Sequence, residues 1–216
     1  MYLYNIHTHK TGREEINGYK VQYMLNTSPG DFEEKVATSG GACFSCGIHP
    51  CSAEEAAGQI DLLRKTGKNK QVFAIGEAGL DKLKGPDMDI QTKVFGQQIE
   101  LAIEIGKPLI IHCVKAWDEL IALYKEYKPD IPWIIHGYRG NVEQTKQLAR
   151  LGFKFSVGEF FNGEAIRYIP LDSIFCETDM ADISICKVYS RISSVLNLEF
   201  NQFVRIVADN VHLALK

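Results

Sequence analysis

Short apolar runs typical of β-strands alternate with amphipathic runs typical of α-helices along the whole chain. The expected strands are Tyr2–His7, Tyr19–Leu25, Ala42–Ile48, Val72–Gly76, Pro108–His112, Pro132–His136, Phe153–Val157 and Ser173–Cys176. The expected helices are Pro29–Thr38, Ala53–Thr66, Asp89–Ile105, Ala116–Tyr127, Val142–Leu151 and two near the end, within Ile185–Leu196 and Glu199–Leu215, with a weaker helical pattern in Phe160–Ile169. Eight alternating strands predict an α/β fold of the TIM type, a (β/α) barrel.

Length and composition restrict this prediction further. The chain has 216 residues, whereas such barrels typically have about 250, so we expect a somewhat reduced or distorted barrel in one domain, residues 1–216. An open doubly wound sheet is the alternative fold, but it usually binds ligands at a single switch point. A net charge of −3 argues against a strongly basic nucleic-acid coat, although a local basic pocket remains compatible with it.

Targeting and redox signals are sparse. No apolar stretch approaches the ~18 residues that span a membrane, and His7, His9 and Lys10 interrupt any apolar segment of a signal peptide. We therefore expect a cytoplasmic protein with no membrane partner. The six cysteines could form disulfides, but most lie in or beside apolar strand-like runs, where free thiols are common.

Candidate metal ligands follow the expected strands. The first strand leads to His7 and His9, and later strands lead to His49, Glu77, His112, His136 and the run Glu177-Thr178-Asp179. The carboxyl ends of barrel strands meet at one face, where barrel enzymes hold their active sites. Four histidines and two carboxylates suit two divalent ions that would activate water and polarise a phosphoryl or carbonyl oxygen.

Six ordered motifs resemble those of the TatD family of metal-dependent hydrolases, within the amidohydrolase-like barrels. The motifs are His7-Thr-His9, Gly47-Ile-His49-Pro50, Gly76-Glu77-Ala-Gly79-Leu80-Asp81, Pro108-Leu-Ile-Ile-His112, the strand end with His136, and Glu177-Thr178-Asp179. The resemblance implies a distorted barrel, one or two divalent metal ions and hydrolysis of phosphodiester bonds in DNA, often from an end.

The resemblance also implies roles for individual residues. His7, His9 and Asp179 would hold one metal, Glu77 would bridge, and His112 and His136 would complete the second. Asp179 and Glu77 would be the catalytic carboxylates, because Asp179 would also orient the attacking water and accept its proton. His49 would lie near the substrate phosphate, and Asp81 would hold the orientation of a ligand.

The chain departs from the family pattern beside these residues. Asn5 stands where the family usually has Asp, and Cys51 where it has a second His. Cys113-Val114 replaces a frequent Ser-Arg, and Gly137-Tyr138-Arg139-Gly140 replaces a Cys-Phe-Ser-Gly sequence. We expect Lys115 and Arg139 to replace the missing Arg as phosphate contacts, with solvated surface charges as the alternative. Tyr138 and Phe161 could stack on a base or simply pack.

The leading hypothesis is therefore a divalent-metal-dependent hydrolase of phosphodiesters, with DNA or another phosphodiester as its partner. Zinc, magnesium or manganese, and also iron, suit mixed His and carboxylate ligands. The first alternative is a metal-dependent amidohydrolase or esterase acting on a small molecule. The second is a non-catalytic metal-binding protein, although retention of Asp179 argues against it.

Overall fold

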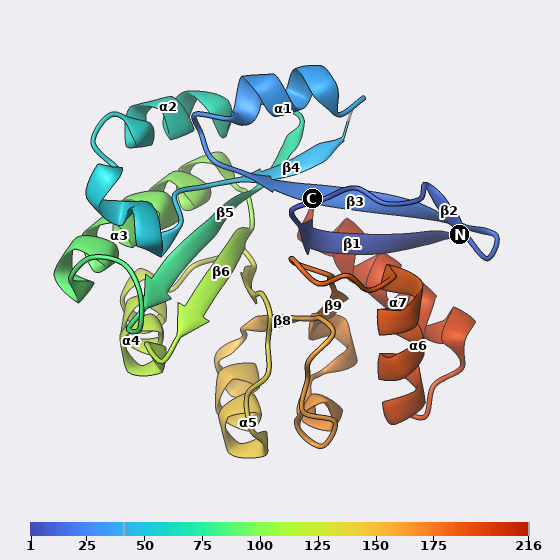
Figure 1. Ribbon diagram of the computed structural model, residues 1–216. Helices are drawn as coiled ribbons and strands as arrows, with labels where there is room; N and C mark the ends of the chain where they lie inside the picture. The colour runs from blue at the N-terminus through green and yellow to red at the C-terminus, as the bar shows by residue number, and fades with distance from the viewer. Residues whose placement is uncertain (41, 216) are drawn as a thin grey trace. The chain divides into compact units, whose positions relative to one another are not determined.

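The computed structural model describes residues 1–40 and 42–215, and these divide into two compact units. The terminal unit comprises Met1–Leu25 and Ile134–Lys216, and the central unit comprises Asn26–Trp133. Both are built from parallel strands and helices, which Figure 1 traces by colour along the chain.

The terminal unit carries strands from both ends of the sequence. Strand β1 (Tyr2–Thr8) pairs in parallel with β3 (Tyr19–Thr27), and β8 (Lys154–Val157) pairs in parallel with β7 (Trp133–Ile135) and β9 (Ile174–Cys176). A bridge between Thr8 and Asp179 joins β1 to the segment after β9. The helices are α5 (Val142–Leu151), α6 (Ile185–Val195) and α7 (Phe200–Ala214), with short 3-10 helices η2 (Ala165–Tyr168) and η3 (Leu171–Ser173).

The central unit is one continuous stretch of chain. Strand β5 (Val72–Asp81) pairs in parallel with β4 (Cys43–Cys46) and β6 (Leu109–Val114). The helices are α1 (Phe32–Thr38), α2 (Gln59–Thr66), α3 (Met88–Ile105) and α4 (Trp117–Tyr127), with a 3-10 helix η1 (Pro50–Glu55). A methyl group on Gly79 of β5 would collide with the carbonyl oxygen of His112 on β6, so only glycine allows this close approach.

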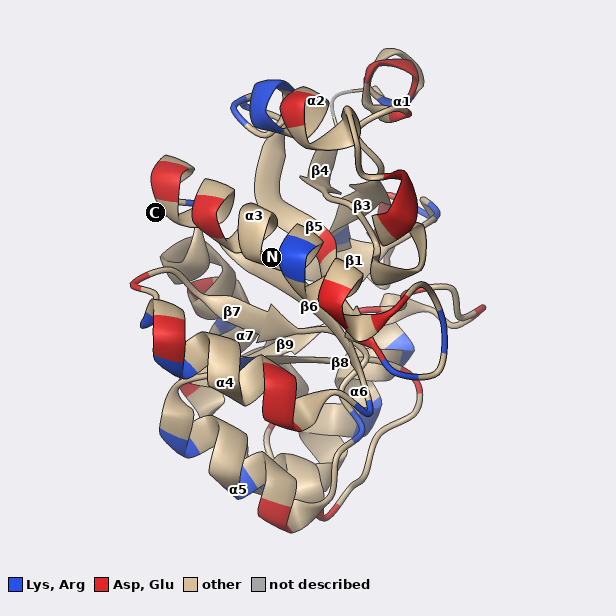
Figure 2. Ribbon diagram, turned by 90° about the vertical axis from the view of Figure 1, so that its left-hand side faces the viewer, with Lys and Arg blue, Asp and Glu red and all other residues tan. Residues whose placement is uncertain are grey.

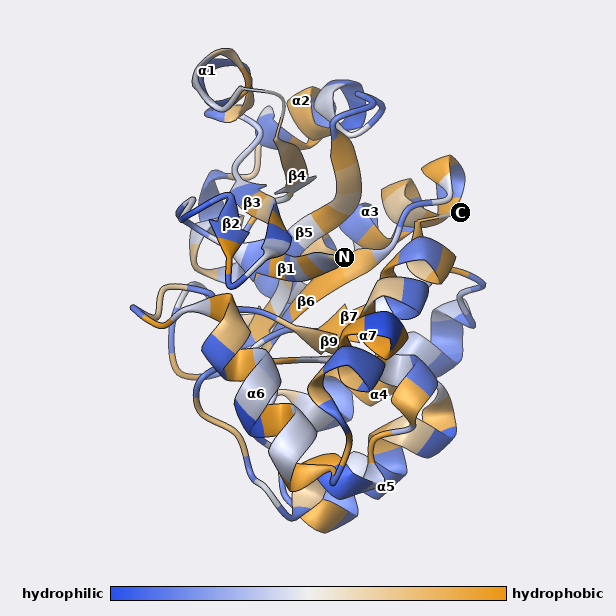
Figure 3. Ribbon diagram, turned by 90° about the vertical axis from the view of Figure 1, so that its right-hand side faces the viewer, coloured by the Kyte–Doolittle hydropathy of each residue, from blue (hydrophilic) through white to orange (hydrophobic). Residues whose placement is uncertain are grey.

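Local signals explain where several helices begin and end. The Asn141 side chain accepts a hydrogen bond from Gln144 N at 2.9 Å and caps α5. Gly106 and Gly152 end α3 and α5 in the left-handed conformation. Helices α6 and α7 carry both hydrophobic and hydrophilic residues (Figure 3). The buried positions, such as Val188 and Phe203, form the apolar face of each amphipathic helix. Strands β7 and β9 carry no charge (Figure 2).

All eight expected strands are present, but two details of the prediction were wrong. A short strand β2 (Glu15–Ile16) forms an antiparallel hairpin with β3 that the pattern did not predict. The expected helix Ala53–Thr66 is broken at Gly58, whose φ of 85° no helix accepts, so η1 and α2 are separate. The side chain of His49 caps η1.

The described residues contain no helix long and apolar enough to cross a membrane. All six cysteines are free. Cys46 and Cys176 are buried, and burial raises the pKa of the Cys46 thiol to about 11 despite the Thr66 hydrogen bond and nearby lysines that lower it.

Candidate metal centre

The terminal unit brings His7, His9 and Asp179 into one cluster. His7 Nε2 lies 3.7 Å and His9 Nε2 3.4 Å from the same carboxylate oxygen, Asp179 Oδ1. Ligands 2.0–2.2 Å from a tetrahedral ion are separated from one another by roughly 3.4 Å. The side chains offer two imidazoles and one carboxylate, which is a donor set for zinc, manganese or iron. The residues therefore fit a divalent ion in both spacing and chemistry.

Backbone contacts between the end of β1 and the segment after β9 build this cluster. Asp179 N donates to His7 O at 3.0 Å, and His9 N donates to Asp179 O at 3.4 Å. Asp179 has a φ of 50°, a left-handed conformation that Asp adopts more readily than most residues. The pairing of β1 with β3 shifts register between Asn5 and Thr8, and such irregularities re-aim side chains beside active sites.

A buried chain of hydrogen bonds also holds the segment after β9 against β1. Asn5 Oδ1 accepts from Thr178 N at 3.0 Å, and Asn5 Nδ2 donates to Thr178 Oγ1 at 2.8 Å. Thr178 Oγ1 in turn donates to Thr8 Oγ1 at 3.2 Å, and Thr8 Oγ1 lies within donating distance of Asp179 O at 3.2 Å. Asn5 is therefore both donor and acceptor here. It holds β1 against the residue that precedes Asp179.

His136 and Glu177 lie beside this cluster in the same unit. The ring centroids of His7 and His136 are 4.3 Å apart, and His136 Nδ1 lies 3.6 Å from Glu177 Oε1. Glu177 Oε1 also accepts from Gly137 N at 2.6 Å, which fixes its carboxylate after β9. His136 therefore lies next to His7, and its predicted role, to complete the second metal site with His112, stays a prediction.

The central unit holds a second cluster, formed by Glu77, His112 and His49. Glu77 Oε1 lies 2.8 Å from His112 Nδ1 and 3.4 Å from His49 Nε2. Glu77 does not follow the end of its strand, as the sequence suggested, but lies inside β5 where the register with β6 shifts between Ile75 and Ala78. Both clusters therefore carry a ligand candidate at a strand irregularity. The bridging role of Glu77 stays a prediction.

Asp81 orients His112 in this cluster. Asp81 Oδ2 lies 3.1 Å from His112 Nε2, while Asp81 Oδ1 accepts from the backbone N–H groups of Leu83 at 2.8 Å and Lys84 at 3.0 Å. Burial alone would raise the pKa of Asp81, but the hydrogen bonds from Leu83, His112 and Lys84 outweigh it and lower that pKa below 3.8. A charged Asp81 favours a proton on His112 Nε2, so that with an ion bound His112 Nδ1 would offer its lone pair to the ion in place of the 2.8 Å contact with Glu77 Oε1.

His49 is arranged differently from His112. Cys51 N donates to His49 Nδ1 at 3.1 Å, so Nδ1 must carry the lone pair. A neutral His49 then has its proton on Nε2, the atom that faces Glu77 Oε1. A metal at Nε2 would have to remove that proton and leave an imidazolate. His49 therefore fits a hydrogen-bond donor better than a metal ligand, although its position is within the cluster.

One residue of the central unit was missed in the sequence. Asn26, at the end of β3, accepts through Oδ1 from Glu77 N at 2.9 Å and from Ser45 Oγ at 3.2 Å. Its Nδ2 lies 3.5 Å from Glu77 Oε2. Asn26 therefore fixes both the backbone and the carboxylate of Glu77. The signal available in the sequence was a polar residue at the end of an apolar strand, the pattern that identified His49 and His112.

The predicted substrate contacts lie on exposed turns. Lys115 directly follows β6 with a φ of 58°, and its side chain is exposed. Arg139 is exposed, with its guanidinium carbon 6.0 Å from the centre of the Phe160 ring. Tyr138 is only 2% exposed and hydrogen-bonds Thr145 Oγ1 at 2.9 Å, so the packing alternative holds and stacking on a base is wrong.

Comparisons with known protein sequences agree with these motifs. A family model described as TatD related DNase matches residues 7–216. The uncharacterized metal-dependent hydrolase YcfH of Escherichia coli K12 is 32% identical over 167 residues, which cover 72% of this chain and 63% of that protein. The 3'-5' ssDNA/RNA exonuclease TatD of Erwinia billingiae is 30% identical over 183 residues, covering 78% and 65% respectively. The chain thus spans less than two thirds of the length of these relatives.

Solved structures show the fold. The crystal structure of YJJV, a TatD homolog from Escherichia coli, matches with a TM-score of 0.80 and 20% identity, covering 90% of this chain and 86% of that one. A TatD family hydrolase from Entamoeba histolytica matches with a TM-score of 0.80 and 16% identity, covering 99% and 97%. The fold is an α/β barrel of eight parallel strands, nearly closed, and the predicted TIM-type class is confirmed.

Proposed function

The chain belongs to the TatD-related DNase family of metal-dependent hydrolases, and we propose that it hydrolyses phosphodiester bonds with DNA as its substrate. One observation carries this proposal: His7 and His9 both face Asp179 Oδ1 at 3.4–3.7 Å, which is the separation of ligands around one ion. The names of relatives support a nucleic-acid substrate, because the relative from Schizosaccharomyces pombe, 28% identical over 159 residues, is named a deoxyribonuclease and the relative from Erwinia billingiae an exonuclease.

In this proposal, His7, His9 and Asp179 would hold one divalent ion, and Glu77, His112 and His136 would contribute further ligands. A divalent ion there would supply Lewis-acid polarisation of a phosphoryl oxygen and would acidify water. The Asp179 carboxylate accepts the proton of the water that attacks phosphorus. Its carboxylate is about one-third exposed, so water reaches it.

His49 contributes to the proposed reaction as a donor. Its Nε2–H is fixed by the Cys51 hydrogen bond to Nδ1 and can donate to a phosphate oxygen of the substrate. That hydrogen bond becomes stronger as negative charge develops on the oxygen. Lys115 and Arg139 stay proposed phosphate contacts because both are exposed cations.

A panel of substrates in the presence of added zinc, manganese or magnesium tests the proposal. The panel contains single-stranded DNA, duplex DNA, bis(p-nitrophenyl) phosphate and simple amides and lactones. We expect turnover of the phosphodiesters and its loss in Asp179→Asn, which also excludes a contaminating nuclease. Turnover of an amide or lactone alone would overturn the phosphodiester assignment and support the amidohydrolase alternative. No turnover and no bound metal would overturn both.

A further inference from the structure

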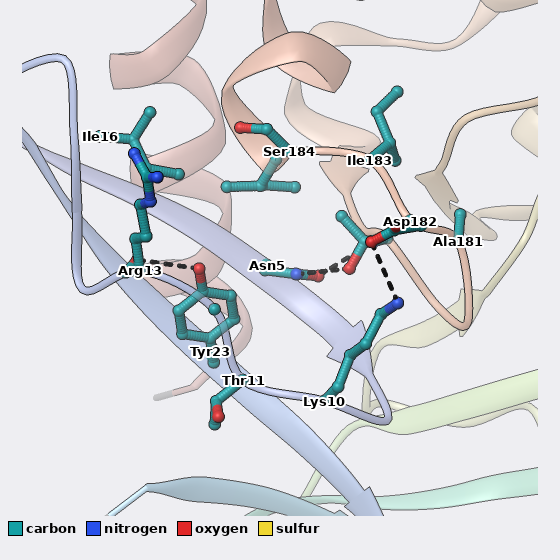
Figure 4. A pocket seen from close by; sticks show the side chains of 13 residues that line it. Asn5, Lys10, Thr11, Arg13, Ile16, Tyr23, Ala181, Asp182, Ile183 and Ser184 are labelled. Atoms are coloured by element: carbon teal, nitrogen blue, oxygen red, sulfur yellow. Dashed lines mark hydrogen bonds and ion pairs between the residues drawn. The ribbon is translucent and has the colours of Figure 1, made fainter.

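A cavity of about 340 Å³ lies in the terminal unit, beside the His7–His9–Asp179 cluster but separate from its ligands. The segment after His9 forms one wall, and the segment after Asp179 forms another (Figure 4). Tyr23 of β3 and buried Asn5 and Thr178 complete the lining. None of the residues that line it is among the proposed metal ligands.

The cavity adjoins the cluster through the chain itself. Lys10 directly follows His9, and Thr178 directly precedes Asp179. Parallel strands usually need a crossover of a dozen or more residues, most often with a helix. Between β1 and β3 the chain instead forms the short hairpin of β2 with β3, and this loop supplies Lys10 and Arg13 to the cavity. A molecule bound by Asp179 could therefore extend directly into the cavity.

The lining combines cations with an apolar wall. Lys10 Nζ lies 3.5 Å from Asp182 Oδ1, and both side chains are at least half exposed, so the pair is easily exchanged for another anion. The Tyr23 hydroxyl donates to Arg13 O at 2.9 Å and fixes the backbone that presents the Arg13 guanidinium (Figure 4). Ile16 and Ile183 line the same cavity. Two cations against one carboxylate favour an anionic group with an apolar neighbour.

We propose that this cavity binds the nucleotide adjacent to the scissile phosphodiester, an inference that rests on the proposed function. Arg13 binds the phosphate of that nucleotide, and Ile16, Tyr23 and Ile183 contact its sugar or base. Lys10 lies on the opposite side of the cavity beside Asp182 (Figure 4). The guanidinium plane offers two parallel donors to phosphate oxygens. The volume lies at the lower end of the range of about 300–1,000 Å³ for ligand sites, as expected for a single nucleotide.

The kinetic test compares thymidine dinucleotides that differ only in a terminal phosphate, at the 5′ or the 3′ end, with the unphosphorylated dinucleotide. We expect one terminal phosphate to raise kcat/KM by about ten-fold to a hundred-fold, the effect of one or two charge-assisted hydrogen bonds. Arg13→Ala should reduce that ratio to near one, and Arg13→Lys should leave an intermediate ratio. Arg150→Ala, an exposed arginine on α5 in the same unit, should preserve it.

A binding measurement separates failure of the cavity from failure of the proposed reaction. Calorimetry would compare dinucleotides with a methylphosphonate linkage, with and without the preferred terminal phosphate, on the metal-loaded protein. Tighter binding of the phosphorylated analogue, lost in Arg13→Ala, supports the cavity even if no dinucleotide is cleaved. Equal binding of the two analogues, or a phosphate preference that survives in folded Arg13→Ala, overturns the proposal even if DNA is hydrolysed.

Discussion

The two clusters differ in how their histidines are held. In the terminal unit, the imidazoles of His7 and His9 approach Asp179 at 3.4–3.7 Å, and the backbone fixes the carboxylate. In the central unit, His112 lies between two carboxylates at 2.8 and 3.1 Å, and His49 accepts a backbone hydrogen bond. The first cluster has the spacing of ligands around an ion, and the second has the spacing of a hydrogen-bonded network.

This difference predicts different contributions to metal binding. An ion can enter the terminal cluster without displacing a 2.8 Å hydrogen bond between its members, whereas the central cluster must first exchange the contact between His112 Nδ1 and Glu77 for metal ligation. Metal affinity in the central cluster therefore depends on which histidine nitrogens carry protons. Substitutions in the two clusters should consequently give distinguishable patterns of metal loss and activity loss.

The largest effect is expected for Asp179→Asn, which keeps the shape of the side chain but removes its charge. Loss of a metal ligand and proton acceptor should lower kcat/KM on bis(p-nitrophenyl) phosphate by about 10³-fold. Metal content, measured by mass spectrometry, should fall as well. Asp209→Asn, on the exposed side of α7 in the same unit, is the matched control and should retain both. Full metal and activity in Asp179→Asn would exclude the terminal cluster as the metal site.

His49→Ala tests whether His49 of the central cluster is a hydrogen-bond donor to the substrate or a metal ligand. Because His49 Nδ1 accepts from Cys51 N, we expect activity to fall by about 10²-fold, the effect of removing one transition-state donor, with metal content unchanged. His112→Ala should lower metal content. His49→Gln places an amide N–H near the Nε2 position and should restore part of the activity. Loss of metal in His49→Ala would show that His49 is a ligand after all.

Asp81→Asn should lower metal affinity or activity by about 10- to 100-fold, because the orientation of His112 is no longer enforced. The hydrogen bonds that depress the pKa of Asp81 below 3.8 also stabilise the folded state. That stabilisation is present above the unfolded pKa and is lost as the pH falls through the lower folded value. The free energies of unfolding of the wild-type protein and of Asp81→Asn, measured between pH 7 and pH 2, should therefore converge at the acidic end. Asp61→Asn, exposed on α2, is the control.

Asn5→Asp tests the hydrogen-bonded segment under the terminal cluster. Asp can accept from Thr178 N but cannot donate to Thr178 Oγ1, so the direction of the bonds to Thr8 must reverse. We expect a loss of about 1–3 kcal/mol in the free energy of unfolding, measured with urea. Asn141→Asp is the matched control, since Asn141 only accepts a hydrogen bond at the start of α5 and Asp can replace it. Equal stability of both variants would contradict a donor role for Asn5.

The smallest effect concerns the thiols next to the clusters. Burial raises the pKa of Cys113, beside His112, to about 12, and burial raises the pKa of Cys176, beside Glu177, well above 9. Both should remain protonated and should not react with a maleimide at pH 8, whereas exposed Cys51 should react. Peptide mass spectrometry of the labelled protein gives the fraction of each cysteine that has reacted. Fast labelling of Cys113 would indicate a thiolate and hence a possible sulfur ligand.

Most of the fold could be predicted because each strand and helix has its own local pattern. The apolar runs located β1, β5 and β6, and the amphipathic runs located α3 and α5. The break at Gly58 was missed because the apolar periodicity continues through it. Strand β2 was missed because two residues are too short to show a period.

The clusters were only partly predictable. His7, His9 and Asp179 could be expected at one face because the carboxyl ends of barrel strands meet there, and the resemblance to the TatD family assigned them to one metal. The tautomer of His49 could not, because it depends on one backbone hydrogen bond from Cys51. Likewise, the contact of Asn5 with Thr178 joins residues 173 positions apart, and nothing in the sequence around either residue indicates the other.

The discontinuous makeup of the terminal unit also sets an order of events during synthesis. The central cluster uses residues 49–112 of one continuous segment, so all of its members have been synthesised before Ile134 is added. The terminal cluster needs His7 from the first strand and Asp179 from the segment after β9. At a synthesis rate of about 5–20 residues per second, these two residues are made several seconds apart. For several seconds, His7 and His9 are therefore present on a nascent chain without Asp179, and an ion at the proposed site would find all three ligands only after Asp179 is made.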